Sequence, residues 1–192
     1  ISYGDSIAII GDGYMSMILV CALSKYPLKD LIVVGHHDWR LDLMSKYGAT
    51  SIINSKTENA WEIINEKTYG KGVDISVEYA GTTESLALSA SICKAKVRSQ
   101  LVMASSYSND TPFIIANYLQ NRAPILVPAY PHTSFDKQKD MERAMWALES
   151  GIFPVDSLMT HNFGFNNIQE AFELNQTRQK GFIKGTFFPK DL

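Results

Sequence analysis

The sequence has few cysteines, no excess of one charge and no long apolar run. Its 192 residues include two cysteines, Cys21 and Cys93, which form no C-x-x-C pair and fall inside predicted helices. We therefore expect buried, reduced thiols, as in cytoplasmic proteins. The chain has 18 Lys and Arg against 20 Asp and Glu, which argues against a dedicated nucleic-acid binder. No apolar run approaches the roughly 20 residues of a membrane span, and no signal peptide is recognisable at the start.

The sequence also lacks a metal-ligand pattern. The four histidines, His36, His37, His132 and His161, have no partners at metal-ligand spacing, so we predict no metal site in this chain. The chain begins at Ile1 and enters its first predicted strand almost at once. This suggests that it is the back part of a longer protein.

Apolar runs of strand length alternate with helical patterns along the first two thirds of the chain. Strands are predicted at residues 7–10, 31–34, 51–53, 73–78, 100–104 and 125–129. Helices are predicted at residues 14–25, 39–46, 58–68, 83–93 and 111–119. Four of the strands are nearly continuous in Val, Ile and Leu, as expected when helices cover both faces of a parallel sheet. The pattern predicts a doubly wound α/β sheet of about six strands.

The character of the sequence changes after Tyr130. A charged amphipathic helix is predicted at residues 136–149, a second helix around residues 168–174, and a last strand at residues 181–188. We therefore divide the chain into a dinucleotide-binding Rossmann-type domain, residues 1–130, and a C-terminal extension of helices and a strand, residues 131–192. The extension is too small for a core of its own.

A glycine turn follows the first strand. Gly11 permits a tight exit from the strand, and Gly13 has no Cβ, so the backbone can approach a phosphate closely. The helix that begins near Tyr14 offers free N–H groups and the positive end of its dipole. Ser16 stands where the third glycine of G-x-G-x-x-G is expected, and its hydroxyl is a candidate phosphate contact. The pattern predicts a cradle for a dinucleotide pyrophosphate.

The residue at the end of the second strand indicates whether the cofactor is NAD(H) or NADP(H). An NAD-dependent enzyme usually has Asp or Glu there to bind the adenosine ribose, whereas this chain has Gly35. Glycine removes a carboxylate that would repel a 2′-phosphate and leaves room for one. His36, His37 and Arg40 can donate hydrogen bonds, which favours NADP(H) over NAD(H). Two alternatives stay open: Asp38 contacts the ribose, or the loop with His36 and His37 is solvated and contacts no ligand.

With these features the chain resembles the medium-chain dehydrogenase/reductase family, in its zinc-type alcohol and polyol dehydrogenase branch. The resemblance extends over essentially the whole chain and is carried by residues 4–13, 40–50, 52–54, 70–74, 78–81, 171–173 and 180–184. The Gly35-His36-His37 loop is similar to that of NADP-dependent secondary alcohol dehydrogenases, and the Gly11-Asp12-Gly13 turn to that of polyol-phosphate dehydrogenases. Ser16 and the absence of a Pro-Gly-Gly turn before the fifth strand mark a divergent member.

The resemblance implies hydride transfer between a nicotinamide cofactor and an alcohol or ketone, with a small alcohol or polyol as substrate. It places the zinc ligands in an N-terminal catalytic domain that is absent here, so no catalytic residue is assigned and the chain alone is expected to be catalytically incomplete. By position it adds Tyr14 and Met15 to the pyrophosphate turn. It also implies that Tyr79, Ala80 and Gly81 form a wall beside the adenine and ribose. Ala104 and Ser105 are expected to contact the nicotinamide through their backbone, and Lys184 is expected to reach the pyrophosphate.

Two alternatives use the same glycine turn. A non-catalytic nucleotide-sensing module needs only the sheet, but the predicted helix and strand after residue 165 suit the return of an enzyme chain to a catalytic domain. An S-adenosylmethionine-dependent methyltransferase would need an acid where Gly35 stands. Pro128 in the sixth strand suits a sheet edge, and the resemblance makes a homodimer through this edge plausible. The opposite interpretation is that Pro128 blocks edge pairing.

Overall fold

The chain folds into two compact units, Ile1–Asp140 and Met141–Leu192. The computed structural model describes residues 1–95, 97–107, 115–130, 132, 134–177 and 179–188. Their helices and strands follow in the order β1 (Ser6–Ile10), α1 (Tyr14–Leu23), β2 (Asp30–Gly35), α2 (Asp38–Lys46), β3 (Ser51–Asn54), α3 (Ala60–Lys67), β4 (Ile75–Glu78), α4 (Thr83–Ser91), β5 (Gln100–Met103), α5 (Ala116–Arg122), β6 (Ile125–Pro128), α6 (Lys137–Glu149), α7 (Val155–Leu158), β7 (Met159–Gly164), the 3-10 turn η2 (Phe165–Asn167), α8 (Ile168–Thr177) and β8 (Lys184–Phe188).

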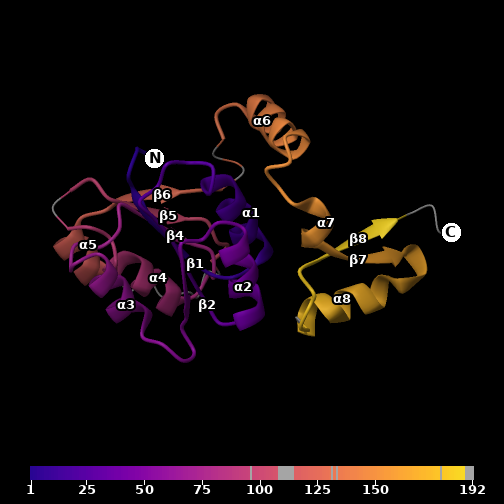
Figure 1. Ribbon diagram of the computed structural model, residues 1–192, viewed down its shortest axis with the longest axis horizontal. Helices are drawn as coiled ribbons and strands as arrows, with labels where there is room; N and C mark the ends of the chain where they lie inside the picture. The colour runs from indigo at the N-terminus through magenta and orange to yellow at the C-terminus, as the bar shows by residue number, and fades with distance from the viewer. Residues whose placement is uncertain (96, 108–114, 131, 133, 178, 189–192) are drawn as a thin grey trace. The chain divides into compact units, whose positions relative to one another are not determined.

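The first unit is built on a parallel sheet of six strands in the order β3-β2-β1-β4-β5-β6. Every neighbouring pair is parallel, with Ile7 of β1 opposite Leu31 of β2 and Ile75 of β4. Figure 1 shows α1 and α2 on one side of this sheet and α3 and α4 on the other. The predicted doubly wound α/β sheet is confirmed.

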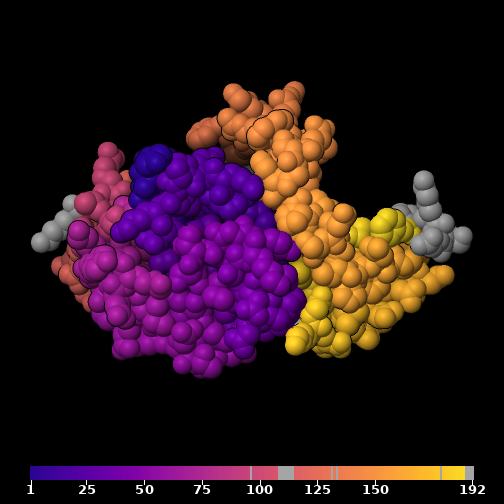
Figure 2. Space-filling view, in the orientation of Figure 1, coloured from indigo at the N-terminus to yellow at the C-terminus, as the bar shows by residue number. Residues whose placement is uncertain are grey.

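The core of the first unit lies on both faces of the central strands. All five residues of β1 are buried, as expected for a strand covered on both sides. On one face Ala8 and Ile10 pack with Ile32 and Val34 of β2 and with Ile64 of α3. In the space-filling view the side chains of the helices close over the strands (Figure 2). Burial of this apolar surface holds the strand ends, and therefore the loops that follow them, in fixed positions.

The helices of the first unit differ at their N-termini. The side chain of Asn59 accepts a hydrogen bond from the Glu62 N–H at the start of α3. Thr82 and Ser85 form a reciprocal capping box at the start of α4. In contrast, α1 begins after Gly13 with no side-chain cap. The cap residue therefore offers no side-chain acceptor for the first N–H groups of α1.

The second unit contains a β-α-β arrangement. Strands β7 and β8 pair in parallel, and α8 lies between them in the sequence. Phe163 of β7, Ala171 of α8 and Phe182 form a small buried cluster. Because the unit has few buried apolar side chains, its own hydrophobic stabilisation is small.

Several sequence-based boundaries were wrong. Cys21 lies in α1, but α4 ends at Ser91 and Cys93 forms an isolated parallel bridge with Val73. The bridge forms because the Val73 N–H donates to the Ile92 carbonyl and the Lys94 N–H to the Val73 carbonyl, which takes these groups away from the helix. Both cysteines are buried and free, as predicted.

Three other differences concern helix and strand limits. The predicted helix 111–119 falls partly outside the described residues, and α5 occupies Ala116–Arg122. The last strand begins at Lys184 rather than at residue 181, because Gly181 has a φ of +95° and the next two residues are buried in a turn. Strand β7 was not predicted, because its sequence Met159–Gly164 carries polar residues and no clear alternation. None of the described helices is long and apolar enough to cross a membrane.

Candidate nucleotide-binding site

The carboxyl ends of β1, β2, β4 and β5 meet at one edge of the sheet. The chain leaves β1 toward β2 on one side, and after β3 it crosses back to place β4 on the other side of β1. In open parallel sheets this reversal leaves a crevice at the carboxyl ends of the two central strands, and ligands bind there. The predicted site residues of the first unit lie at the ends of these four strands, in the loops that follow them, and in the first turns of α1 and α2.

The glycine turn after β1 combines a tight bend with an open surface. Gly11 has a φ of +127°, and a Cβ there would lie 3.2 Å from the carbonyl carbon of Tyr79. Gly11 therefore allows β1 to end directly against the turn after β4. A Cβ on Gly13 would meet no atom within 4 Å. The space over Gly13 is thus open, which suits the close approach of a phosphate group.

The N-terminus of α1 lies next to this open space. The helix has ten residues and no side-chain cap, so its dipole and first N–H groups can bind an anion. Met15 is 54% exposed, whereas Ser16 is 1% exposed. The Ser16 hydroxyl is buried and has no hydrogen-bond partner among the described residues. The side chain of Ser16 therefore faces the interior of the unit, and its contact to a phosphate stays a prediction.

The side chain of Asp12 fills the space beside Gly35 that was interpreted as room for a phosphate. A Cβ on Gly35 would lie 2.5 Å from the Asp12 Cβ and 2.7 Å from its Oδ2. Gly35 is therefore required by the side chain of Asp12. Oδ2 of Asp12 accepts hydrogen bonds from the backbone N–H groups of His36 and His37, both at 2.8 Å, and lies 2.9 Å from Nδ1 of His37.

These contacts keep Asp12 ionised. Burial alone would raise the pKa of Asp12, but the hydrogen bonds from His36 and His37 outweigh it and lower the pKa below its ordinary value. Asp12 was not among the predicted site residues. An acidic residue inside a phosphate turn, combined with glycine at the end of the second strand, is the signal that could have found it.

Arg40 faces the interior rather than the solvent. Its side chain is 5% exposed, its Nη1 donates to the backbone carbonyl of Asp12 at 3.4 Å, and its guanidinium lies 5.0 Å from the centre of the Trp39 ring. Arg40 therefore links α2 to the turn after β1. His36 is exposed, with its Nδ1 3.2 Å from the Ser55 hydroxyl.

The turn after β4 is held by a buried carboxylate that the sequence analysis did not select. Glu78 is 0% exposed, and its Oε1 accepts hydrogen bonds from the N–H groups of Ala80 and Gly81 at 2.7 and 2.8 Å. The Ser85 hydroxyl donates to the same oxygen at 2.7 Å. This fixes the backbone of the predicted adenine wall, in which Tyr79 is half-buried and Ala80 exposed.

Glu78 also ties this turn to the loop after β5. Its Oε2 accepts a hydrogen bond from the Tyr107 hydroxyl. Burial first, and then this hydrogen bond, raise the pKa of Tyr107, so the tyrosine is the donor. Gly81 packs on Ser105, since a Cβ on Gly81 would lie 3.4 Å from the Ser105 Cβ. The structure thus brings Gly81 and Ser105 together. The Ser105 hydroxyl is buried and has no partner among the described residues.

Three predicted contacts remain. Tyr14 opens α1 and Ala104 follows β5, and both are partly buried. Lys184 opens β8 in the second unit and is exposed. Its role at a pyrophosphate stays a prediction.

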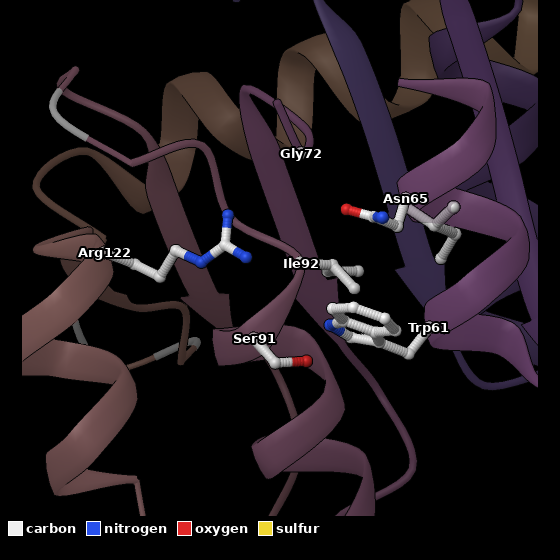
Figure 3. Close-up of a pocket in the computed structure, with 7 residues that line it drawn as sticks. Trp61, Asn65, Gly72, Ser91, Ile92 and Arg122 are labelled. Atoms are coloured by element: carbon white, nitrogen blue, oxygen red, sulfur yellow. The ribbon is translucent and has the colours of Figure 1, made fainter. Parts of the chain in front are cut away.

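A small cleft elsewhere in the first unit is unrelated to these loops. It lies between α3, α4 and α5 and is lined by Trp61, Ile64, Asn65, Gly72, Ser91, Ile92 and Arg122 (Figure 3). Ser91 and Arg122 are the last residues of α4 and α5, and Gly72 precedes β4, which places this side of the cleft near the amino edge of the strands. Arg122 donates to the carbonyl of Cys93 at 3.2 Å, so the guanidinium stabilises the chain just after α4.

The comparison with known families decides the relationship. The model of a family described as zinc-binding dehydrogenase matches residues 18–148, which is more than half of the chain. The chain belongs to the zinc-binding dehydrogenase family. The predicted resemblance is confirmed. In the described ranges no three His, Cys, Asp or Glu side chains gather to hold a metal ion, so these ranges offer no ligand set for zinc.

Individual members of the family agree with this assignment. The chain is 28% identical to sorbitol dehydrogenase of Bacillus subtilis over 176 residues, which are 88% of this chain and 46% of that protein. It is 25% identical to L-threonine 3-dehydrogenase of Pyrococcus abyssi over 94% of this chain and 51% of that protein. The chain therefore spans about half the length of the curated relatives it matches.

The fold is the same as that of solved dehydrogenase structures. Alcohol dehydrogenase TADH from Thermus sp. ATN1 superposes with a TM-score of 0.83 at 18% identity, covering 97% of this chain and 53% of that one. A short chain alcohol dehydrogenase from Escherichia coli CFT073, complexed with the cofactor NADH, gives a TM-score of 0.81 at 20% identity, covering 96% and 52%.

Proposed function

We propose that this chain is the cofactor-binding part of an NAD(P)-dependent oxidoreductase that acts on an alcohol or polyol. The carrying observation is the open space over Gly13 at the uncapped N-terminus of α1, located where the strand order reverses. Backbone N–H groups there suit a pyrophosphate. Membership of the zinc-binding dehydrogenase family supports the reaction class.

The residues of this chain would bind and orient the cofactor. Gly11, Gly13, Tyr14 and Met15 would hold the pyrophosphate. The loops fixed by Glu78 would place Tyr79, Ala80 and Gly81 beside the adenosine and Ala104 and Ser105 beside the nicotinamide. When bound, the nicotinamide ring accepts or donates the hydride. The groups that move the proton, the zinc site and the substrate pocket belong to the proposed remainder of the protein.

We also propose NADP(H) as the preferred form. No carboxylate extends from the end of β2, because that position is Gly35. The nearby carboxylate of Asp12 is 9% exposed and already accepts three hydrogen bonds. The exposed carboxylate of Asp38 accepts a hydrogen bond from Asn54. An adenosine ribose would therefore meet the imidazoles of His36 and His37, which suit a 2′-phosphate.

Two proposals concern organisation. The division after residue 130 would separate the nucleotide-binding domain from a C-terminal extension that packs on the remainder of the protein. The edge strand β6, with Ile125 40% and Leu126 38% exposed, would pair with a second copy to form a homodimer. An unpaired, partly apolar edge favours such pairing.

Calorimetric titration of the 192-residue chain with NADPH and NADH tests the function. Binding of at least one cofactor is expected, with dissociation constants in the millimolar range or tighter. The matched variant is Gly13→Asp. Aspartate is a preferred N-cap residue, so the stability of α1 should be retained, while its carboxylate would occupy the open N–H groups and repel a pyrophosphate. Absence of binding to the unchanged chain at millimolar cofactor, or binding unaltered by Gly13→Asp, would contradict the proposal.

A further inference from the structure

The imidazole of His37 is held from one side only. Its Nδ1 lies 2.9 Å from Oδ2 of Asp12, and the side chain of His37 remains 28% exposed. No hydrogen bond of its Nε2 is found within the part of the chain that the structure describes. The ring is therefore anchored at the turn after β1 and presents its second nitrogen away from that anchor.

This anchor determines where the proton of a neutral His37 lies. Oδ2 of Asp12 also accepts the N–H groups of His36 and His37, so the carboxylate is ionised and acts as an acceptor. Nδ1 of His37 must then carry the hydrogen atom of this contact. A second proton on Nε2 produces an imidazolium whose charge is compensated by Asp12.

We propose that Asp12 is a positioning residue for the adenosine 2′-phosphate, acting through His37. Asp12 holds the loop after β2 by two backbone N–H groups and orients His37 so that Nε2 donates to the 2′-phosphate of NADP(H). The proposal rests on the proposed function and assigns Asp12 a role inside the same site. NAD(H) carries a hydroxyl at this position, so its affinity depends much less on the charge of His37.

The other charged groups around His37 leave this arrangement intact. On the same loop the His36 ring lies 5.7 Å from the His37 ring, centre to centre, and its Nδ1 is directed to Ser55. From α2, Arg40 is buried against the carbonyl of Asp12. The Asp38 carboxylate accepts a hydrogen bond from the side chain of Asn54. The carboxylate of Asp12 is thus the one seen in hydrogen-bond contact with the His37 ring.

The first test separates the two nitrogens of His37. In His37→Asn the amide can replace Nδ1 as donor to Asp12, while Nε2 is removed. We expect the NADPH dissociation constant of the 192-residue chain to rise about tenfold, as for loss of a charge-assisted hydrogen bond, and that of NADH to change less than twofold.

The second test asks whether Asp12 acts through His37. Asp12→Asn preserves shape and removes the charge, so it should weaken NADPH binding about three- to tenfold and NADH binding less than twofold. Combined with His37→Asn it should cause little further loss, because the two residues act as one unit. Asp74→Asn is the matched control, since the Asp74 carboxylate also accepts a backbone N–H and pairs with a cation, Lys94, but at the opposite edge of the sheet. It should leave both affinities unchanged.

The results of these titrations separate the proposed cofactor binding from the proposed role of Asp12. If neither NADPH nor NADH binds the unchanged chain, the proposed function is refuted, and the role of Asp12 with it. If NADPH and NADH bind but lose affinity equally in Asp12→Asn, Asp12 is merely structural and the inference alone is wrong. Unchanged NADPH affinity in His37→Asn, or tighter binding of NADH than NADPH to the unchanged chain, also overturns it.

Discussion

Replacement of Gly35 by alanine tests the central contact of the site. The φ angle of Gly35 is not positive, so alanine fits the backbone without strain and any cost comes from its Cβ. That atom would lie 2.5, 2.7 and 2.8 Å from three atoms of the Asp12 side chain, Cβ, Oδ2 and Cγ. Real Cβ atoms essentially never approach other heavy atoms this closely. Either the strand or Asp12 must therefore move.

The strand is the more rigid of the two. Gly35 lies opposite Asn54 in the β2–β3 pair, and its carbonyl accepts the N–H of Ser55 at 2.8 Å. We therefore expect Asp12 to be displaced, with loss of its three hydrogen bonds to His36 and His37. Bonds to a charged acceptor contribute about 1.5–3 kcal/mol each, but water replaces part of them in a loop that is only partly buried. Gly35→Ala should lower the free energy of unfolding by about 2–4 kcal/mol, which corresponds to a fall in the melting temperature of about 5–15 °C.

Thermal and urea unfolding of the 192-residue chain, followed by circular dichroism, measure this cost. The same substitution in an Asp12→Gly background provides the control, because the three atoms that alanine would contact are then absent. There the added cost should be within about 1 kcal/mol, which gives a strongly non-additive double-mutant cycle. An equal cost in both backgrounds, or less than about 0.5 kcal/mol in the first, would refute the assignment of Gly35 to the Asp12 contact.

Three further predictions concern the other loops and the sheet edge. Glu78→Gln can keep an amide oxygen toward the N–H groups of Ala80 and Gly81 but replaces the acceptor of the Tyr107 hydroxyl by an NH₂ group. It should lower the free energy of unfolding by about 1–3 kcal/mol in urea, and an unchanged midpoint would contradict the role of Glu78. Because the pKa of Asp12 is lowered on folding, its stabilisation is present above the ordinary aspartate pKa of about 3.9 and is lost as the pH falls through the lowered value. The difference in free energy of unfolding between the unchanged chain and Asp12→Asn should therefore shrink over that acidic range. A difference that stays constant down to pH 2 would argue against a lowered pKa of Asp12. Leu126→Lys should convert the proposed dimer to a monomer in sedimentation velocity, whereas a chain that is already monomeric would exclude pairing through β6.

The fold was largely predictable because it depends on short-range pattern. Continuous Val, Ile and Leu runs such as Ile7–Ile10 identified strands buried on both faces, and all of β1 is buried. The glycine turn was predictable for the same reason, since Gly11 must adopt a positive φ that other residues avoid. The strand β7 was missed because its residues Met159–Gly164 carry no such pattern, and its pairing with β8 spans the whole of α8.

The site was predictable only in outline. From the order of residues we could predict that the second strand ends in glycine followed by two histidines, and we interpreted this glycine as space for a phosphate. The folded chain fills that space with Asp12, 23 residues earlier in the sequence, and joins two loops through Glu78 and Tyr107. Periodicity and turn chemistry depend on neighbouring residues and can be recognised in the sequence. Which side chain fills the space beside a given residue depends on how separate loops meet at the sheet edge, and this is determined by packing of the whole unit.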